Sequence, residues 1–118
     1  MKISTMRDLL DADVLACEDK LGNHVYSAFG CDLMSDVLAF ADNQAVLLSG
    51  LVNPQVIRTA VMMDMNCIVF VRAKRPSEDI IKLAKEHELV VMVTEKPLYT
   101  SCGLLYANGL LGSKKVKQ

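Results

Sequence analysis

The stretch GCDLMSD, residues 30–36, brings together a thiol, two carboxylates and a hydroxyl. Cys31 could act as a nucleophile, because a thiolate at the N-terminus of a helix has a lowered pKa. Such a nucleophile also needs a base. His24 lies near the other end of an expected strand, and His87 lies near the end of an expected helix. Neither position favours a catalytic pair, so a small thiol enzyme using Cys31 is our second alternative.

The two carboxylates of this stretch, Asp32 and Asp36, are four residues apart. On a helix they would share a face, where they could bind a metal or act as an acid–base pair. A simpler interpretation is that Asp32 caps the helix that follows, with Ser35 at the third position, and that Asp36 stays in water. We expect the cap, and we expect neither a metal site nor a cofactor.

The loop RAKRP, residues 72–76, is the best candidate for an anion contact. Its cations, Arg72, Lys74 and Arg75, precede an expected helix whose free N–H groups add positive potential. The alternative is that these long side chains merely keep the loop solvated. Phosphate-binding motifs of the GxGxxG and GxxxxGKS types do not occur in the sequence, which argues against ATP or dinucleotide chemistry of those kinds.

Strand patterns of two kinds surround these residues. Continuous aliphatic runs predict strands at residues 45–50, 67–71 and 89–94. Residues 14–17 and 23–29 are further strand candidates, joined by the short segment EDKLG in a hairpin that would run antiparallel.

Helical spacing appears between the strands, at residues 4–10, 32–41, 53–65, 77–88 and 97–109. Ser4 or Thr5, then Asn53, then Ser77 are the expected N-caps of three of these helices. In the last helix we expect one buried face, formed by Leu98, Cys102, Leu105 and Tyr106. Strands that are apolar on both sides predict an α/β fold, a mostly parallel sheet of about four or five strands with helices on both faces.

Ligands of open parallel sheets usually sit beyond the carboxyl ends of the strands. That rule selects four loops, at residues 30–32, 49–53, 72–75 and 94–96. The residues that we expect to contact a ligand there are Gly30, Asp32, Ser35, Asn53, Arg72 and Lys74.

The composition, with 52% hydrophobic and 23% charged residues, is that of an ordinary globular protein. The longest apolar runs are far shorter than the roughly 20 residues of a membrane span, so we expect no membrane partner. The N-terminus meets acidic residues too early for a secretion signal. We therefore expect a cytoplasmic protein whose four cysteines are reduced thiols.

The formal charge of −1 is unevenly distributed, because three of the 13 basic residues lie in the final segment SKKVKQ. The rest of the chain is net acidic, which argues against a nucleic-acid partner. We expect one domain, residues 1–112, followed by a flexible Lys-rich tail, residues 113–118.

Several segments, in this order, resemble the DRTGG domain family. They are CDLMSDV (31–37), similar to a DLLSDV-like segment of the family, NPQVIRTAVMMDMNCIVF (53–70), KRPSEDIIKLAKEHELVVMVT (74–94) and GLLYANGL (103–110). Asp32, Ser35 and Asp36 match the family's pattern. The name-giving Asp-Arg-Thr-Gly-Gly stretch is not recognisable before Asp32, where the chain reads GNHVYSAFG. No role of those residues therefore carries over.

The resemblance implies a regulatory or accessory α/β domain without a catalytic activity of its own. Related copies lie beside nucleotide-sensing CBS domains in certain inorganic pyrophosphatases and in front of phosphate acetyltransferase domains. The resemblance also implies a fold similar to the N-terminal, non-kinase domain of HPr kinase/phosphorylase, and a homodimer, because embedded copies tend to pair. Kinase chemistry is not expected, since the phosphate-binding loop is missing.

Our leading hypothesis is a non-catalytic regulatory domain, homodimeric, that binds a small anionic or nucleotide-like ligand at the carboxyl edge of the sheet. The first alternative is a protein–protein interaction subunit of a larger metabolic complex. Its contact would be an exposed strand edge or the methionines Met62, Met63 and Met65, which otherwise fill the core.

Overall fold

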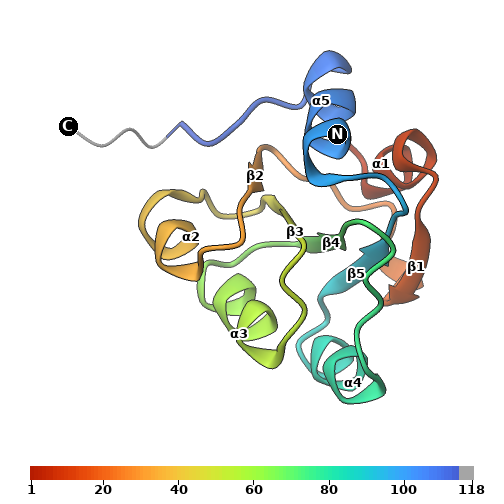
Figure 1. Ribbon diagram of the computed structural model, residues 1–118, viewed down its shortest axis with the longest axis vertical. Coiled ribbons are helices and arrows are strands. Elements are labelled where there is room, and N and C mark those ends of the chain that lie inside the picture. Colours follow the sequence, from red (N-terminus) through yellow and green to blue (C-terminus); the bar gives the residue numbers. More distant parts are fainter. Residues whose placement is uncertain (115–118) are drawn as a thin grey trace.

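The computed structural model describes residues 1–114 and shows a single sheet between two layers of helices (Figure 1). The strands, in the order in which they lie in the sheet, are β1 (Asp13–Ala16), β5 (Val90–Val93), β4 (Cys67–Phe70), β3 (Val46–Ser49) and β2 (Ala28–Gly30). Strands β2 to β5 are parallel, and β1 pairs antiparallel with β5. The expected five-stranded, mostly parallel α/β sheet is confirmed.

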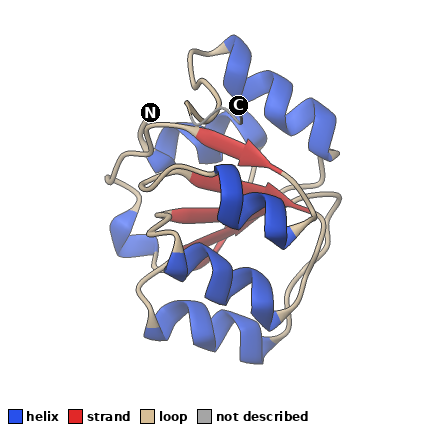
Figure 2. Ribbon diagram, turned by 90° about the vertical axis from the view of Figure 1, so that its left-hand side faces the viewer, coloured by secondary structure: helices blue, strands red, loops and turns tan. Residues whose placement is uncertain are grey.

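The helices follow the strands in the expected alternation. They are α1 (Ile3–Leu10), the 3-10 turn η1 (Glu18–Lys20), α2 (Met34–Phe40), α3 (Pro54–Met62), α4 (Glu78–Glu86) and α5 (Leu98–Ala107). Helices α1 and α5 cover one face of the sheet, and α2, α3 and α4 cover the other (Figures 1 and 2). Among residues 1–114, every helix is too short or too polar to cross a membrane.

Alternate residues of the central strands supply the two halves of the core. In β4, Ile68 and Phe70 pack under α2 to α4, whereas Cys67 and Val69 pack under α1 and α5. All four side chains are fully buried. Because both faces of a strand are buried in this way, the strand reads in the sequence as one continuous aliphatic run.

The expected hairpin of residues 14–17 and 23–29 is wrong, because β1 and β2 lie at opposite edges of the sheet. The segment between them runs along the amino ends of the strands, where the carbonyl of His24 accepts a hydrogen bond from Asn66 Nδ2 at 2.8 Å. Val25 is fully buried with the α1–α5 side of the core. Burial of this side chain and pairing of β1 with β5 outweigh the local preference for a turn.

Two of the four expected N-caps are present. Asn53 and Ser77 accept hydrogen bonds from the third residues of α3 and α4, at 3.1 and 3.4 Å. The expected cap of α1 by Ser4 or Thr5 is wrong. The N–H groups of Ile3 and Ser4 donate instead to the carbonyls of residues 23 and 21, both at 2.9 Å. The crossing segment therefore caps α1 with its backbone.

The free edge of β2 is partly covered by the end of the described chain. Gly112 forms a parallel bridge with Ala28. Ser113 Oγ then donates to the carbonyl of Phe40, and the N–H of Lys114 donates to the carboxylate of Asp42 at 3.0 Å. The first two residues of the expected tail are thus held at the end of α2, and residues 115–118 lie outside the described residues.

Candidate functional site

The carboxyl ends of four parallel strands meet at one edge of the sheet, and the four expected loops lie there. We distinguish a β2–β3 half, residues 30–35 and 49–53, from a β4–β5 half, residues 72–75 and 94–96. The antiparallel β1 begins at this edge, because Asp13 is the pairing partner of Val93. Residues 10–13 therefore join the β4–β5 half.

Asp32 is not the N-cap of α2, in contrast to the sequence prediction. Leu33 occupies the N-cap position, and no side chain caps the helix. The Asp32 carboxylate instead accepts hydrogen bonds from Ser49 Oγ and from the N–H of Gly50, both at 2.8 Å. Ser49 is fully buried, so its hydroxyl needs an acceptor. Asp32 supplies that acceptor and clamps the end of β2 to the end of β3.

Two more of the expected ligand contacts of the β2–β3 half, Gly30 and Asn53, also have structural roles. A Cβ atom at Gly30 would lie 2.6 Å from Cys102 Sγ, so this glycine allows α5 to pack on the end of β2. The Asn53 side chain caps α3. Ser35 lies exposed on α2. None of these residues lines the pocket of about 250 Å³ at the other half of the edge.

Cys31 lies at this edge without a histidine beside it. Its sulfur accepts a hydrogen bond from the N–H of Leu33 at 3.3 Å. His24 stacks on Tyr26 near the amino ends of the strands, and His87 follows α4 at the same opposite edge. Residues 1–114 contain no group of three His, Cys, Asp or Glu side chains placed to hold a metal ion. Burial raises the pKa of Cys102, the thiol that packs on Gly30, so this second sulfur is a poor nucleophile.

The basic loop of the β4–β5 half is a strained turn. Arg72 and Ala73 both have positive φ, 58° and 56°, and the N–H of Lys74 donates to the carbonyl of Val71 at 3.2 Å. This left-handed conformation costs about 1–2 kcal/mol for each residue other than glycine. The turn is held by two more backbone bonds, from Arg72 to the carbonyl of Lys96 at 3.0 Å and from Ala73 to that of residue 94 at 2.8 Å.

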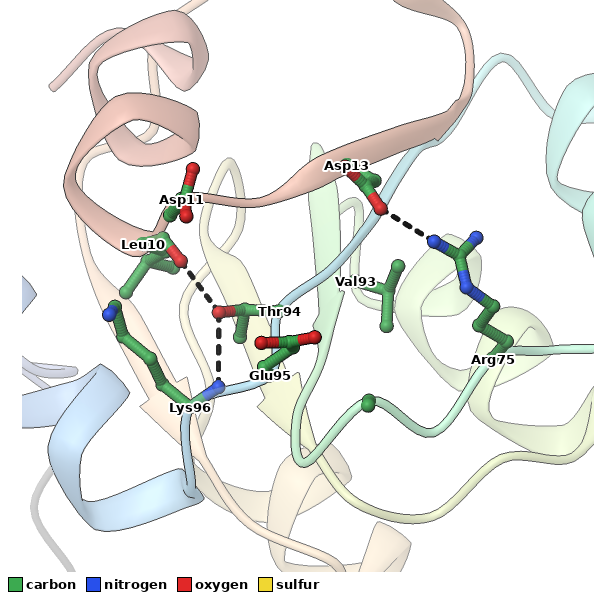
Figure 3. Close-up of a pocket in the computed structure, with 9 residues that line it drawn as sticks. Leu10, Asp11, Asp13, Arg75, Val93, Thr94, Glu95 and Lys96 are labelled. Carbon is green, nitrogen blue, oxygen red and sulfur yellow. Dashed lines mark hydrogen bonds and ion pairs between the residues drawn. The ribbon is translucent and has the colours of Figure 1, made fainter.

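A pocket of about 250 Å³ lies beside this turn, between the end of α1, the start of β1 and the end of β5 (Figure 3). Its polar lining residues are Asp11, Asp13, Arg75, Thr94, Glu95 and Lys96. Thr94 Oγ1 donates to the carbonyl of Leu10 at 2.6 Å and accepts from the N–H of Lys96 at 3.3 Å. Through these bonds Thr94 joins the α1 end of the pocket to the segment that follows β5.

The charges around the pocket are only partly paired. Arg75 forms an ion pair with Asp13 at 2.5 Å. Asp11, Glu95 and Lys96 have no side-chain partner among the residues that the structure describes. Arg72 and Lys74 are exposed and flank Ala73, which lines the pocket. The β4–β5 half therefore offers unpaired carboxylates and ammonium or guanidinium groups within one small region.

The sequence prediction selected the edge but not the pocket. Arg72 and Lys74 were expected at a ligand site and lie on the adjoining turn, whereas Asp11 and Asp13 were not expected there. Their position depends on β1 pairing antiparallel with β5, and the hairpin prediction placed β1 beside β2 instead. The sequence offered one signal, the two acidic residues Asp11 and Asp13 between a helix and an edge strand. This signal points to the pocket only when β1 is placed beside β5.

Comparison with known proteins shows the fold. A crystal structure of the CBS and DRTGG domains of the regulatory region of Clostridium perfringens pyrophosphatase, complexed with the activator diadenosine tetraphosphate, matches with a TM-score of 0.72. The identity is 14%, and the match covers 98% of this chain and 52% of that chain. No family model matches the sequence, and no curated protein does. The chain thus shares a fold with about half of a DRTGG-containing regulatory region, as the resemblance implied.

Proposed function

We propose that the protein is a cytoplasmic, non-catalytic regulatory domain of the DRTGG type that binds a small anionic or nucleotide-like ligand at the carboxyl edge of its sheet. The observation that carries this proposal is the pocket of the β4–β5 half, which lies beside the exposed cations Arg72 and Lys74. Open parallel sheets bind ligands at this edge. The β2–β3 half contributes structure, because the Asp32 carboxylate and the Asn53 amide oxygen already accept hydrogen bonds.

The matched pyrophosphatase structure supports a regulatory role by analogy. That protein is described as a regulatory region complexed with a nucleotide activator. The present chain spans about half its length. The analogy therefore favours a role in sensing, while the ligand of this chain is inferred from its own pocket.

Thermal shift and titration calorimetry test this proposal. We expect at least one of AMP, ADP, diadenosine tetraphosphate, inorganic phosphate and acetyl phosphate to raise the melting temperature, because a ligand that binds only the folded state stabilises it. Lys74→Ala should weaken binding about tenfold, as expected for a lost charge-assisted contact. Lys82→Ala, which removes an exposed lysine from α4, is the matched control. Absence of binding by every probe would contradict the ligand proposal.

We further propose that the protein forms a homodimer through the outer face of α5. This helix, LYTSCGLLYA, has no charged residue. Tyr99 is 90% exposed and Tyr106 is 66% exposed, although Tyr106 was expected to be buried. Gly103 lies between them at helical spacing and has open space where a Cβ would project. A helix without a charged face is usually buried, which supports the proposal that another surface covers this one.

A second copy of the chain is the occupant that fits best. An uncharged face offers no charge complementarity to a charged partner, and a two-fold axis would bring the exposed tyrosines and the Gly103 gaps of the two copies into one self-complementary interface. At these exposed fractions, the four tyrosines of two copies would bury about 500–800 Å², somewhat less than half of the roughly 1,200–2,000 Å² of a stable interface. The surrounding surface of α5 and Leu111, which is 54% exposed, would supply more.

Sedimentation analysis distinguishes this dimer from the alternative of a protein–protein interaction subunit. We expect a dimer that becomes monomeric in the variant Tyr99→Ser/Tyr106→Ser. Tyr26→Ser, at a tyrosine that is 68% exposed near the amino ends of the strands, should leave the dimer intact. A wild-type monomer at about 100 μM that binds a different protein stoichiometrically would favour the interaction subunit.

A further inference from the structure

The pocket of the β4–β5 half has two parts with opposite charge. Inside, Asp11, Asp13 and Glu95 face two cations, Arg75 and Lys96. Outside, the turn contributes the exposed cations Arg72 and Lys74. We infer that this site binds a phosphorylated polyol, such as a sugar phosphate or the ribose phosphate part of a nucleotide, with its hydroxyl groups in the pocket and its phosphate on the turn. This inference rests on the proposed function, since it names the ligand of the same edge.

The interior suits hydroxyl groups rather than phosphate. An ionised carboxylate is only an acceptor, and the exposed Asp11 and Glu95 have no side-chain partner within residues 1–114, so both are free to accept hydrogen bonds from hydroxyl groups of a ligand. A polyol supplies several donors without charge. A phosphate in the same place would meet three carboxylates, whereas only one cation of the lining, Lys96, is unpaired within the described part of the chain, so the net effect would be repulsion.

The backbone of the turn that carries Arg72 and Lys74 is held at a fixed place relative to the pocket. Arg75 is engaged by Asp13 at 2.5 Å, which leaves Arg72, Lys74 and Lys96 as the unpaired cations of this half. The turn that carries Arg72 and Lys74 is hydrogen-bonded to the carbonyls of Thr94 and Lys96, both pocket residues. A ligand that places an anionic group on the turn can therefore place hydroxyl groups in the pocket at the same time. A phosphorylated sugar carries both groups.

The size of the pocket limits how much of a ligand it encloses. Its volume of about 250 Å³ is below the roughly 300–1,000 Å³ of sites that enclose drug-sized ligands. One sugar ring fits this space, and a dinucleotide does not. A nucleotide would place its base outside the pocket.

Titration calorimetry with ribose 5-phosphate, ribose, inorganic phosphate and glycine tests the inference. We expect ribose 5-phosphate to bind about tenfold tighter than inorganic phosphate, because two or more hydroxyl contacts are added. Glu95→Gln should remove most of this difference and leave inorganic phosphate within about twofold, whereas Lys74→Ala should weaken both probes. Glu86→Gln and Lys82→Ala, at exposed positions of α4, are the matched controls.

Asp11→Asn is a second interior variant that keeps the fold testable, since asparagine tolerates the left-handed conformation that Asp11 adopts at φ 49°. Melting curves first establish that each variant folds. Equal binding of inorganic phosphate and ribose 5-phosphate would overturn the inference and leave the proposed function standing. Tighter binding of glycine would overturn it in favour of a zwitterion, and the failure of every phosphate and nucleotide probe would overturn both.

Discussion

In the β2–β3 half of the carboxyl edge, a carboxylate, an amide and a glycine all hold the protein together. Asp32 accepts two hydrogen bonds at 2.8 Å, Asn53 caps α3, and Gly30 lets α5 approach β2. In the β4–β5 half, Asp11 and Glu95 have no side-chain partner within residues 1–114, and a turn with positive φ at two residues borders a pocket. Residue types that could do chemistry are structural in one half and free in the other.

The difference shows how position in a sheet decides the use of a polar residue. The β2–β3 half carries the edge strand β2, which has only three residues and needs side-chain contacts to stay in place. The β4–β5 half is anchored by backbone pairing on both sides of β5. Three of its charged side chains, Asp11, Glu95 and Lys96, therefore form no side-chain hydrogen bond or ion pair within residues 1–114, and strain in its turn can be tolerated.

The largest effect is expected from Asp32→Ala, which opens the clamp of the β2–β3 half. The loss of two charge-assisted hydrogen bonds should lower the free energy of unfolding by about 2–3 kcal/mol. Urea denaturation measures this loss, and Asp36→Ala, at a carboxylate in the first turn of α2, should change the free energy of unfolding by less than about 0.5 kcal/mol. In the double variant Asp32→Ala/Ser49→Ala, the loss of stability should be smaller than the sum of the two single losses, because both substitutions remove the same hydrogen bond. Strict additivity would show that the clamp does not form.

Gly30→Ala sharpens the same comparison through packing. The added methyl group would meet Cys102 Sγ, so we expect a loss of about 1–2 kcal/mol. In a Cys102→Ala background the loss should fall below about 0.5 kcal/mol, because the methyl group then has space. An equal loss in both backgrounds would assign the effect of Gly30 to something other than α5 packing.

Ala73→Gly should act in the opposite direction, because it relieves strain in the β4–β5 half. Glycine adopts positive φ freely, and its greater freedom in the unfolded chain offsets part of the gain. We expect a net stabilisation of about 0.5–1 kcal/mol. A lower melting temperature in this variant would contradict this expectation. It would mean that contacts of the Ala73 methyl group stabilise the fold by more than the relief of strain does.

Arg75→Ala should have the smallest effect. The Arg75–Asp13 pair is exposed on both sides, and such pairs contribute less than about 1 kcal/mol and are screened by salt. We expect a loss of about 0.5 kcal/mol or less in low salt that vanishes in about 1 M sodium chloride. A loss that persists at high salt would show that the pair is part of the framework of the β4–β5 half.

Much of the fold is readable in the sequence because local patterns determine it. Continuous aliphatic runs predicted β3, β4 and β5, and Asn53 and Ser77 predicted the starts of α3 and α4. The positions of β1 and β2 were not predicted, since strand pairing is a long-range property. A short segment such as residues 14–17 can pair with any free strand edge of the sheet that also allows its apolar side chains to be buried. Its own sequence does not specify which strand that is.

The candidate site was predicted only in outline. The rule that ligands sit beyond the carboxyl ends of parallel strands selected the four loops. The residue types in these loops then suggested which side chains would bind a ligand. Asp32 looked like a cap because its spacing fits one, but the buried hydroxyl of Ser49 lies 17 residues away and offers a stronger partner. Asp11 looked unremarkable, since only the placement of β1 beside β5 brings it to the pocket.

The hydrogen bond from Thr94 to Leu10 joins residues 84 positions apart. During synthesis on the ribosome, where domains begin to fold from the N-terminus, strands β2, β3 and β4 can pair before β5 has emerged. The pocket cannot close until residues 94–96 reach the waiting end of α1. Ligand binding would therefore report that the whole sheet has been assembled, because a nascent chain that stops within α4 lacks residues 93–96 of the pocket and the parts of both core halves that β5 and α5 supply.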